Sequence, residues 1–210
     1  MKKLSKEGYV TLREGAEVIE ADAHGDKVLL LPDGTYLKLF RRKRLISTAL
    51  IFPYAQRFAQ NATKLARLNI PTVSIIDLYR IPSVQRTAVH YNPLVGSTLR
   101  NRPNGIDEVL ADKLGTFIRD LHDKGIYFRS LHLGNIVLTP ENLLGLIDIS
   151  DMKFLNSPLS LRLRLRNFNH SARHPNDRNI LNKTINAFSQ GYQYTGKSPI
   201  TEDILRTIYT

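Results

Sequence analysis

The amino-acid sequence predicts an α+β fold in which a β-rich N-terminal part precedes a mainly helical C-terminal part. Three observations support this prediction. Most strand-like apolar runs lie before residue 95, the clearest amphipathic helical pattern starts at Asp107, and a segment rich in Pro, Gly and Asn, Asn92–Asn104, lies between the two parts. We expect residues 1–95 and 96–210 to form two lobes that together make one domain.

The N-terminal part has the pattern of a hairpin, a helix and two further strands. The turn residues Pro32-Asp33-Gly34 separate two apolar runs, which is typical of a β-hairpin. Apolar residues then recur near helical spacing as far as Asn69-Ile70-Pro71, which ends the helix. The predicted elements are strands at Lys27–Leu31 and Thr35–Phe40, a helix at Leu45–Leu68, and strands at Thr72–Arg80 and Val84–Tyr91.

The C-terminal part begins with a helix whose apolar residues share one face. This helix is predicted at Asp107–Lys124, and Gly125 just beyond it is a typical helix-ending residue. Two short strands are predicted at Ile136–Leu138 and Leu143–Ile149. The residues from Ser157 onward are predicted to be mostly helical, which makes this part the helical lobe.

Composition excludes several classes of protein. The 210 residues are 42% hydrophobic and 23% charged, which is ordinary for a folded chain rather than a disordered one. The chain has no Cys, which excludes disulfides, thiolate zinc sites and a cysteine nucleophile. The longest apolar stretch, Leu45–Ala55, is far shorter than the ~20 residues of a membrane-spanning helix. The N-terminal residues also lack the apolar core of a signal peptide, so we expect a cytoplasmic protein.

The net charge of +11, from 30 Lys and Arg against 19 Asp and Glu, favours an anionic partner. Acidic residues are absent from Gly34–Ile76, and Asp177 is the only one from Met152 to Ser198. Nucleic acid, an anionic membrane and a phosphorylated ligand all suit such a surface. The structural alternative is a pair of solvated basic faces with no particular partner.

Two basic motifs lie within these stretches. The run RRKR at Arg41–Arg44 precedes the helix predicted from Leu45, where four cations oppose the helix dipole. The segment Arg41–Phe58, which starts with this run, is interpreted as a basic amphipathic element at a membrane surface, as a nucleic-acid contact, or as an ordinary packed helix with a basic N-terminal approach. Further along, Arg162, Arg164 and Arg166 alternate with leucines. These arginines either bind substrate phosphates or anionic lipid headgroups, or they are solvated.

The segment Gly125–Asp151 carries the most informative polar residues. A polar loop with His132 and Asn135 is followed by a predicted hairpin that ends at Asp148. An Asn carbonyl and a carboxylate are hard oxygen ligands that suit Mg²⁺ bridging phosphate oxygens. Each residue alone also has a structural interpretation, because Gly-Asn is ordinary turn chemistry and an Asp at a strand end often caps the next segment.

Four motifs occur together in a characteristic order. Lys38 lies in the strand-like run TYLKLF, NPLVGSTLR follows at Asn92–Arg100, FRSLHLGN lies at Phe128–Asn135, and Asp148 comes thirteen residues after Asn135. This set resembles the protein-kinase-like superfamily, with its strand lysine, hinge, H-x-D-L-H-x-G-N loop and DFG-type Asp. The closest resemblance is to the small-molecule and lipopolysaccharide-core kinases, and more narrowly to bacterial proteins of the toluene-tolerance or lipopolysaccharide-kinase type.

The resemblance implies a reduced two-lobed kinase-like fold and an ATP-dependent phosphotransferase. In this interpretation Lys38 orders the phosphates of ATP, Asn135 and Asp148 hold Mg²⁺, and Ser130 and Asp151 lie at the acceptor hydroxyl. The implied acceptor is an anionic substrate, a sugar of lipopolysaccharide core or a phosphate-bearing glycolipid. Such a substrate places the protein at the inner face of the cytoplasmic membrane, in peripheral contact with it.

The sequence also departs from the kinase pattern. Ser130 stands where the family has its catalytic Asp, Phe128 replaces the preceding His, and DFG reads Asp148-Ile149-Ser150. There is no G-x-G-x-x-G, and the helix predicted at Leu45–Leu68 has no Glu to pair with the strand lysine. Since a Ser hydroxyl cannot take a proton as a carboxylate does, Asp151 is the candidate substitute base.

These departures leave two alternative functions open. The first is a pseudokinase that binds nucleotide or a partner without turnover. The second is a basic protein that binds nucleic acid or a membrane surface. Nucleic acid is the partner that we favour least, because the sequence has no recognised nucleic-acid-binding motif and its aromatic residues are not interleaved with the basic runs.

Overall fold

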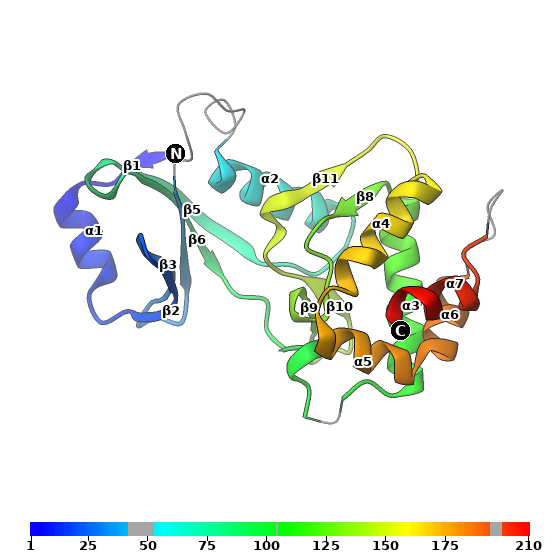
Figure 1. The fold of residues 1–210 in the computed structure, drawn as a ribbon. Coiled ribbons are helices and arrows are strands. Elements are labelled where there is room, and N and C mark those ends of the chain that lie inside the picture. The colour runs from blue at the N-terminus through cyan, green and yellow to red at the C-terminus, as the bar shows by residue number, and fades with distance from the viewer. Residues whose placement is uncertain (42–52, 104, 194–198) are drawn as a thin grey trace. The chain divides into compact units, whose positions relative to one another are not determined.

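The computed structural model describes residues 1–41, 53–103, 105–193 and 199–210 (Figure 1). It confirms the predicted α+β fold, because a mixed β-sheet forms the N-terminal part and helices dominate the C-terminal part. The chain divides into two compact units, Met1–Leu94 and Val95–Thr210. Below, these are the N-terminal unit and the C-terminal unit.

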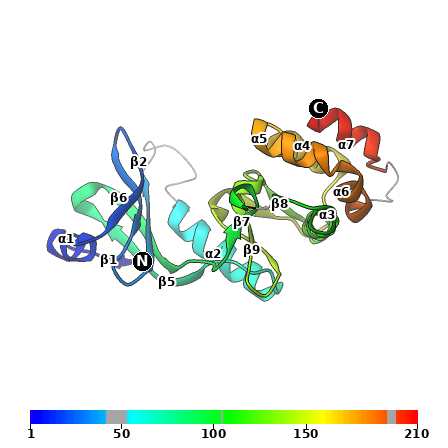
Figure 2. The ribbon, with the colours of Figure 1, turned by 90° about the horizontal axis from the view of Figure 1, so that it is seen from below.

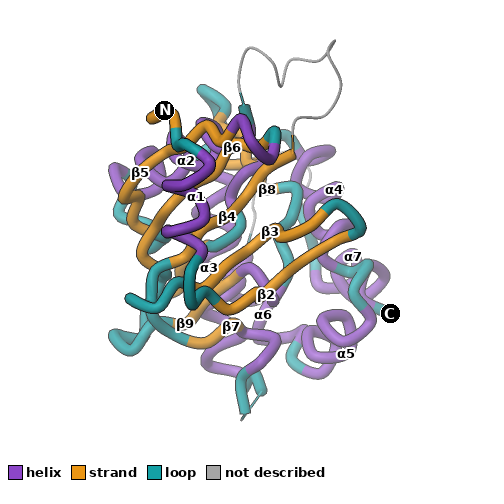
Figure 3. Tube along the Cα trace, turned by 90° about the vertical axis from the view of Figure 1, so that its left-hand side faces the viewer, coloured by secondary structure: helices purple, strands orange, loops and turns teal. Residues whose placement is uncertain are grey.

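The N-terminal unit is built on one six-stranded sheet, whose strands are orange in Figure 3. The strand order is β1-β5-β6-β4-β3-β2, and all neighbours are antiparallel except β1 and β5. The elements are β1 (Lys2–Lys3), α1 (Lys6–Arg13), β2 (Glu17–Asp22), β3 (Gly25–Leu30), β4 (Tyr36–Arg41), α2 (Tyr54–Arg67), β5 (Ser74–Ile81) and β6 (Arg86–Asn92), with a 3₁₀ turn at Pro82–Val84.

The predicted hairpin is confirmed as β3 and β4. Its turn places Gly34 at φ +81°, a conformation that glycine adopts without steric cost. The Asp33 carboxylate accepts the backbone N–H of Thr35 at 2.9 Å, which closes the turn. Helix α1 was not predicted; it begins at Ser5, whose side chain accepts the N–H of Gly8 at 3.0 Å.

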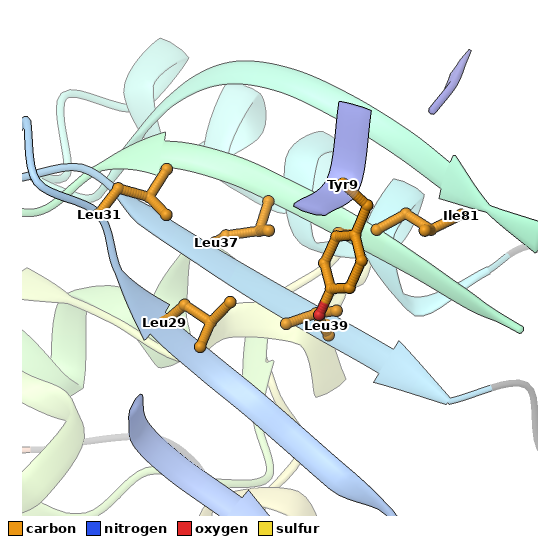
Figure 4. Packing of buried hydrophobic residues seen from close by; sticks show 7 residues of the cluster. Tyr9, Leu29, Leu31, Leu37, Leu39 and Ile81 are labelled. Atoms are coloured by element: carbon orange, nitrogen blue, oxygen red, sulfur yellow. The ribbon is translucent and has the colours of Figure 1, made fainter. Parts of the chain in front are cut away.

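Side chains alternate across β4, so that one face of the sheet packs on α1 and the other on α2. Leu37 and Leu39 join a buried apolar cluster with Tyr9 of α1 (Figure 4). On the opposite face Phe40 packs against Phe58 of α2, with ring centroids 6.2 Å apart. The even-numbered positions of β4 therefore lie on the α2 face.

The predicted helix at Leu45–Leu68 is described from Tyr54 to Arg67 only. The part of the prediction at 45–52, and three of the four residues of the RRKR motif, lie outside the described residues. The helix ends where Asn69 takes a left-handed conformation, φ 55°, so the predicted stop signal is confirmed.

The C-terminal unit has five helices among its described residues, together with two small sheets. Helices α4 to α7 are grouped beside α3 in Figure 2. The sheets have the orders β10-β9-β7 and β11-β8. The elements are β7 (Ser97–Thr98), α3 (Glu108–Asp123), β8 (Ile126–Phe128), β9 (Ile136–Leu138), β10 (Leu144–Leu146), β11 (Met152–Phe154), α4 (Leu161–Ser171), α5 (Pro175–Lys183), α6 (Ile185–Tyr192) and α7 (Glu202–Tyr209).

Helix α3 confirms the predicted helix and forms the centre of this unit. Asp107 caps it by accepting the N–H of Leu110 at 2.8 Å. Its partner is α6, and the two backbones approach so closely that a Cβ on Gly191 would lie 1.8 Å from the carbonyl oxygen of Asp112. Glycine at this position is therefore a packing requirement of the helix pair.

The arginines of the Leu-Arg repeat do not form one surface. The repeat lies on helix α4, where residues two apart point in nearly opposite directions. Arg164 is fully buried, donates to Asp123 Oδ1 at 2.6 Å, and also donates to the Leu159 carbonyl at 2.9 Å. The interpretation of Arg164 as a phosphate or lipid ligand is therefore wrong, whereas Arg162 and Arg166 are exposed.

A buried histidine ties α3 to α4 and α6. His122 has no exposed surface; its Nε2 lies 3.1 Å from Asn167 Oδ1 and its Nδ1 lies 2.7 Å from the Tyr192 hydroxyl. Burial is the main cause that lowers the pKa of His122 to about 3. The unfolded state binds this proton near pH 6.5, so folding loses stability as the pH falls from about 6.5 to about 3.

We predict that His122 contributes about 1.4 kcal/mol per pH unit to this loss. The measurement is the free energy of urea unfolding at several pH values between 6.5 and 4. His122→Gln replaces the imidazole with an amide that both donates and accepts hydrogen bonds but does not titrate. The free energy of unfolding of this variant should therefore depend less steeply on pH. Equal slopes in the variant and the original chain would contradict the assignment.

Within the described part of the chain, no helix combines the length and the hydropathy needed to span a lipid bilayer.

Candidate functional site

The loop between β8 and β9, residues 129–135, is formed by two successive tight turns. The first is closed by the Leu131 N–H, which donates to the Phe128 carbonyl at 3.1 Å. The second is a 3₁₀ turn at Leu133–Asn135, closed by the Asn135 N–H on the His132 carbonyl at 2.9 Å. These turns fix the backbone that carries Ser130 and Asn135.

Asn135 is held so that its amide oxygen is the remaining acceptor. Its Nδ2 donates to the Ser130 carbonyl at 3.0 Å and lies 3.2 Å from His132 Nε2. The Ser130 carbonyl can accept a hydrogen bond only from the nitrogen of the Asn135 side-chain amide, so this contact determines which side of the amide carries the oxygen. The backbone carbonyl of Asn135 accepts a hydrogen bond from the Ile147 N–H at 3.0 Å, which attaches the residue before Asp148 to this loop.

Asp148 has a strained backbone. Its φ of 50° and ψ of 48° are left-handed values, which non-glycine residues adopt rarely and mostly where structure or function requires them. The residue is half-buried and starts the 3₁₀ turn Ile149–Asp151. This turn brings Asp151 back toward the loop that carries Ser130.

Ser130 and Asp151 form a hydrogen-bonded pair. The Ser130 hydroxyl donates to Asp151 Oδ2 at 2.7 Å. The other carboxylate oxygen, Oδ1, is buried and has no hydrogen-bond partner among the described residues. Burial raises the pKa of Asp151, against the hydrogen bond from Ser130 and the charge of Arg129, while the charge of Asp148 raises it further. A carboxylate in this environment binds a proton more strongly than an exposed one.

Helix α5 supports the loop through a buried ion pair. Asp177 is fully buried and binds Arg100 through two hydrogen bonds, of 2.7 Å and 2.8 Å. The same carboxylate accepts the Leu133 N–H at 2.8 Å. Asp177 thus joins the segment that follows β7 to the middle of the loop between β8 and β9.

His132 lies between these two groups of contacts. Arg100 Nη2 approaches its Nδ1 at 3.2 Å, and Asn135 approaches its Nε2. Burial, followed by the charges of Arg100 and His174, lowers the pKa of His132 to about 4. The ring is therefore neutral near pH 7. Its unprotonated nitrogen accepts a hydrogen bond from the neighbour on that side, and its protonated nitrogen only contacts the neighbour on the other side.

The predicted site residues fall into both units. Ser130, Asn135, Asp148 and Asp151 lie close together in the C-terminal unit. Lys38 is in the N-terminal unit, where it lies half-buried in the middle of β4, opposite Val28 and Val89. Its Nζ lies 6.0 Å from the ring centroid of Phe40, on the α2 face of the sheet.

Arg100 and Asp177 were not predicted as part of the site. The sequence does contain a signal, because Asp177 is the only acid between Met152 and Ser198 and follows Pro175, which starts α5. A single acid in a long basic stretch that is placed in the first turn of a helix is a candidate for a buried ion pair. Its partner, 77 residues away, cannot be identified by pattern.

The residues present fit a magnesium ion better than a transition metal. Of the described residues, no three His, Cys, Asp or Glu side chains are grouped to hold a metal ion. Asn135 and Asp148 instead offer one amide oxygen and one carboxylate. Mg²⁺ commonly takes one or two such ligands and fills its remaining positions with substrate phosphates and water.

Comparison with known proteins finds similarity to solved structures. No protein-family model matches the chain, and no curated protein matches it. The chain is similar to a solved structure described as a divergent kinase lacking the glycine-rich loop, which regulates membrane ultrastructure of the Toxoplasma parasitophorous vacuole. The two are 18% identical, the TM-score is 0.45, and the match covers 86% of this chain and 72% of the other.

Proposed function

We propose that this chain is a kinase-like phosphotransferase that moves the γ-phosphoryl group of ATP to a hydroxyl. The observation that carries the proposal is the hydrogen-bonded pair Ser130–Asp151, set beside Asn135 and Asp148 in the same unit. Ser130 lies five residues before Asn135, which is the spacing of base and metal ligand in the catalytic loop of protein kinases.

In this proposal Lys38 orders the phosphates of ATP. Lys38 lies on the third strand of the meander β2–β3–β4, which is the strand that carries the phosphate-binding lysine in protein kinases. Asn135 and Asp148 would hold Mg²⁺, as the catalytic-loop Asn and the DFG Asp do in those enzymes. When bound, the ion neutralises charge on the phosphates.

The acceptor proton passes through Ser130. Since Asp151 Oδ1 is buried, an acceptor reaches this carboxylate through the Ser130 hydroxyl, which already donates to Oδ2. The acceptor O–H donates to Ser130 Oγ as the Ser130 proton moves to Asp151. The acceptor oxygen then bonds to the γ-phosphorus while the bond to the bridging oxygen breaks, and ADP leaves with that electron pair.

An anionic acceptor is part of the proposal. Arg129 is exposed next to Ser130, and α4 is fixed beside it because Asn167 Nδ2 donates to the Phe128 carbonyl at 2.6 Å. Burial, then the charges of Arg173, Arg166 and Arg129, lower the pKa of His170 on this helix. These cations are suited to a phosphate-bearing substrate. A sugar of lipopolysaccharide core or a glycolipid, met at the inner face of the cytoplasmic membrane, is the acceptor that the sequence resemblance suggests.

A pseudokinase is the second candidate, and Ser130 in place of the catalytic Asp is the observation that favours it. Helix α2 also has no Asp or Glu to pair with Lys38. The variant Ser130→Asp separates the two candidates. A chain that binds ATP without turnover, and gains turnover only in Ser130→Asp, is a pseudokinase.

The proposal is tested by thermal unfolding with ATP, with and without Mg²⁺. A ligand that binds only the folded state stabilises it by RT ln(1 + [L]/Kd), about 2.7 kcal/mol at 100 times Kd. We expect a Mg²⁺-dependent rise in the unfolding midpoint that Asp148→Ala abolishes. Asp120→Ala removes an equal charge from an exposed position on α3 and should keep the rise. No shift at millimolar ATP would contradict the proposal.

A further inference from the structure

A polar cavity lies at one end of the sheet in the N-terminal unit, far along the chain from the loop between β8 and β9. Its volume is about 410 Å³. It is open to solvent and is lined by the turn between β2 and β3, the end of β4 and the connection from β5 to β6. The lining residues are His24, Arg41, Ser83, Val84, Gln85 and Arg86. Two of the six are arginines and none is acidic.

Arg86 carries a nearly buried charge in the wall of this cavity. Arg86 is 8% exposed, and its Nη2 donates a hydrogen bond to the His24 carbonyl. No carboxylate of the described residues forms a salt bridge with it. Asp22 is near enough for the charge of Arg86 to contribute to lowering its pKa, but the larger cause is the His24 N–H, which donates to Asp22 Oδ1 at 2.8 Å. A guanidinium has five N–H donors, and the bond to the His24 carbonyl uses one of them.

Arg41 places a second positive charge directly beside the first. In the antiparallel pair of β4 and β6, Arg41 and Arg86 are opposite each other and therefore lie on the same face of the sheet. Like charges in this position destabilise a sheet, and a buried charge without an ionic partner costs further free energy. An anion between the two guanidinium groups would remove both costs.

We propose that this cavity is a binding site for a phosphate group, held by Arg41 and Arg86. Guanidinium groups bind phosphate through pairs of parallel hydrogen bonds, which two facing arginines can supply from both sides. The phosphate belongs either to a small soluble molecule or to a lipid headgroup. The site lies entirely in the N-terminal unit and does not depend on the proposed phosphotransferase activity.

The test is the affinity of the full chain for inorganic phosphate, measured by calorimetry and thermal unfolding at constant ionic strength. Arg41 is exposed, so Arg41→Gln should fold normally and weaken phosphate binding about tenfold, the effect of 1.4 kcal/mol. Arg80→Gln is the matched control, because Arg80 is exposed in the same sheet, opposite Thr87, and does not line the cavity. Equal weakening in both variants, or no binding by the original chain, would overturn the proposal.

A second result separates a binding site from a general effect of positive charge. Without phosphate, Arg41→Gln should unfold at the same temperature as the original chain or higher, since it relieves the repulsion from Arg86. A lower midpoint would show that Arg41 stabilises the fold by another contact and would count against the site. Arg86→Met should abolish the response to phosphate; because it leaves the His24 carbonyl unpaired, Arg41→Gln remains the decisive variant.

The source of the phosphate is identified with vesicles of phosphatidylcholine containing phosphatidic acid. Sedimentation with these vesicles that Arg41→Gln reduces, and that inorganic phosphate competes away, assigns the site to a lipid headgroup. Binding of inorganic phosphate without sedimentation assigns it to a soluble phosphate. Either result supports the site, and sedimentation that neither Arg41→Gln nor phosphate reduces would exclude the lipid assignment.

Discussion

Replacing Asp151 with Asn is expected to lower phosphoryl transfer by about 10²–10⁴-fold, the usual contribution of a general base. Asn has the shape of Asp and can still accept the Ser130 hydroxyl hydrogen bond, but it cannot take the proton. The same variant should unfold at a higher temperature. Burial raises the pKa of Asp151, so its ionised form destabilises the folded state near pH 7, and a neutral side chain removes that cost.

Turnover and the unfolding midpoint are therefore measured on the same protein. Ser130→Ala is the companion variant, because it interrupts the proton path but leaves the carboxylate in place. Turnover of the original chain should also fall on acidification, as Asp151 becomes protonated at a pH above that of an ordinary Asp. Unchanged turnover in Asp151→Asn would remove Asp151 from the mechanism, and a lower midpoint would contradict the account of its environment.

Replacing Asp177 with Ala is expected to destabilise the C-terminal unit by about 3 kcal/mol, the lower end of the range for breaking a buried ion pair. The lower end applies because the Arg100 side chain is 28% exposed, whereas Asp177 is fully buried. The change leaves the Arg100 guanidinium and the Leu133 N–H without their shared acceptor. The loop between β8 and β9 then loses its hydrogen bond to Asp177 of α5.

The free energy of urea unfolding measures this effect. Asp120→Ala, on the surface of α3, is the control for loss of an Asp and should change it by much less. Adding Arg100→Met to Asp177→Ala should recover part of the loss, since the unpaired guanidinium is then removed. A loss below ~1 kcal/mol in Asp177→Ala would show that the pair does not hold the loop.

Local patterns in the sequence predicted the elements that local chemistry determines. The β3–β4 hairpin follows from its turn residues, and α3 follows from its apolar face and from Gly125 just beyond its end. The eight residues of α1 carry too short a pattern to distinguish a helix from a loop. The Leu-Arg repeat of α4 has the period of a strand, and the buried position of Arg164 depends on contacts with residues distant in sequence, such as Asp123 and Tyr192.

The candidate site was predictable to the extent that it follows the order of the chain. Ser130, Asn135 and Asp148 were identified because the motifs that contain them resemble those of the kinase-like superfamily in order and spacing, and Asp151 as a carboxylate near enough in sequence to return to the loop. The ion pair of Arg100 and Asp177 depends on contact between distant segments, which no local pattern contains. The same holds for Arg41 and Arg86, which face each other only through the register of β4 and β6.

The most direct test of the proposed function is the formation of ADP from ATP and Mg²⁺ by the purified full chain, with water or an added sugar as acceptor. The proposal predicts ADP formation well above that of Asp148→Ala, with Asp151→Asn close to that background. ADP formation by the original chain that does not exceed that of Asp148→Ala would contradict the assignment as a phosphotransferase.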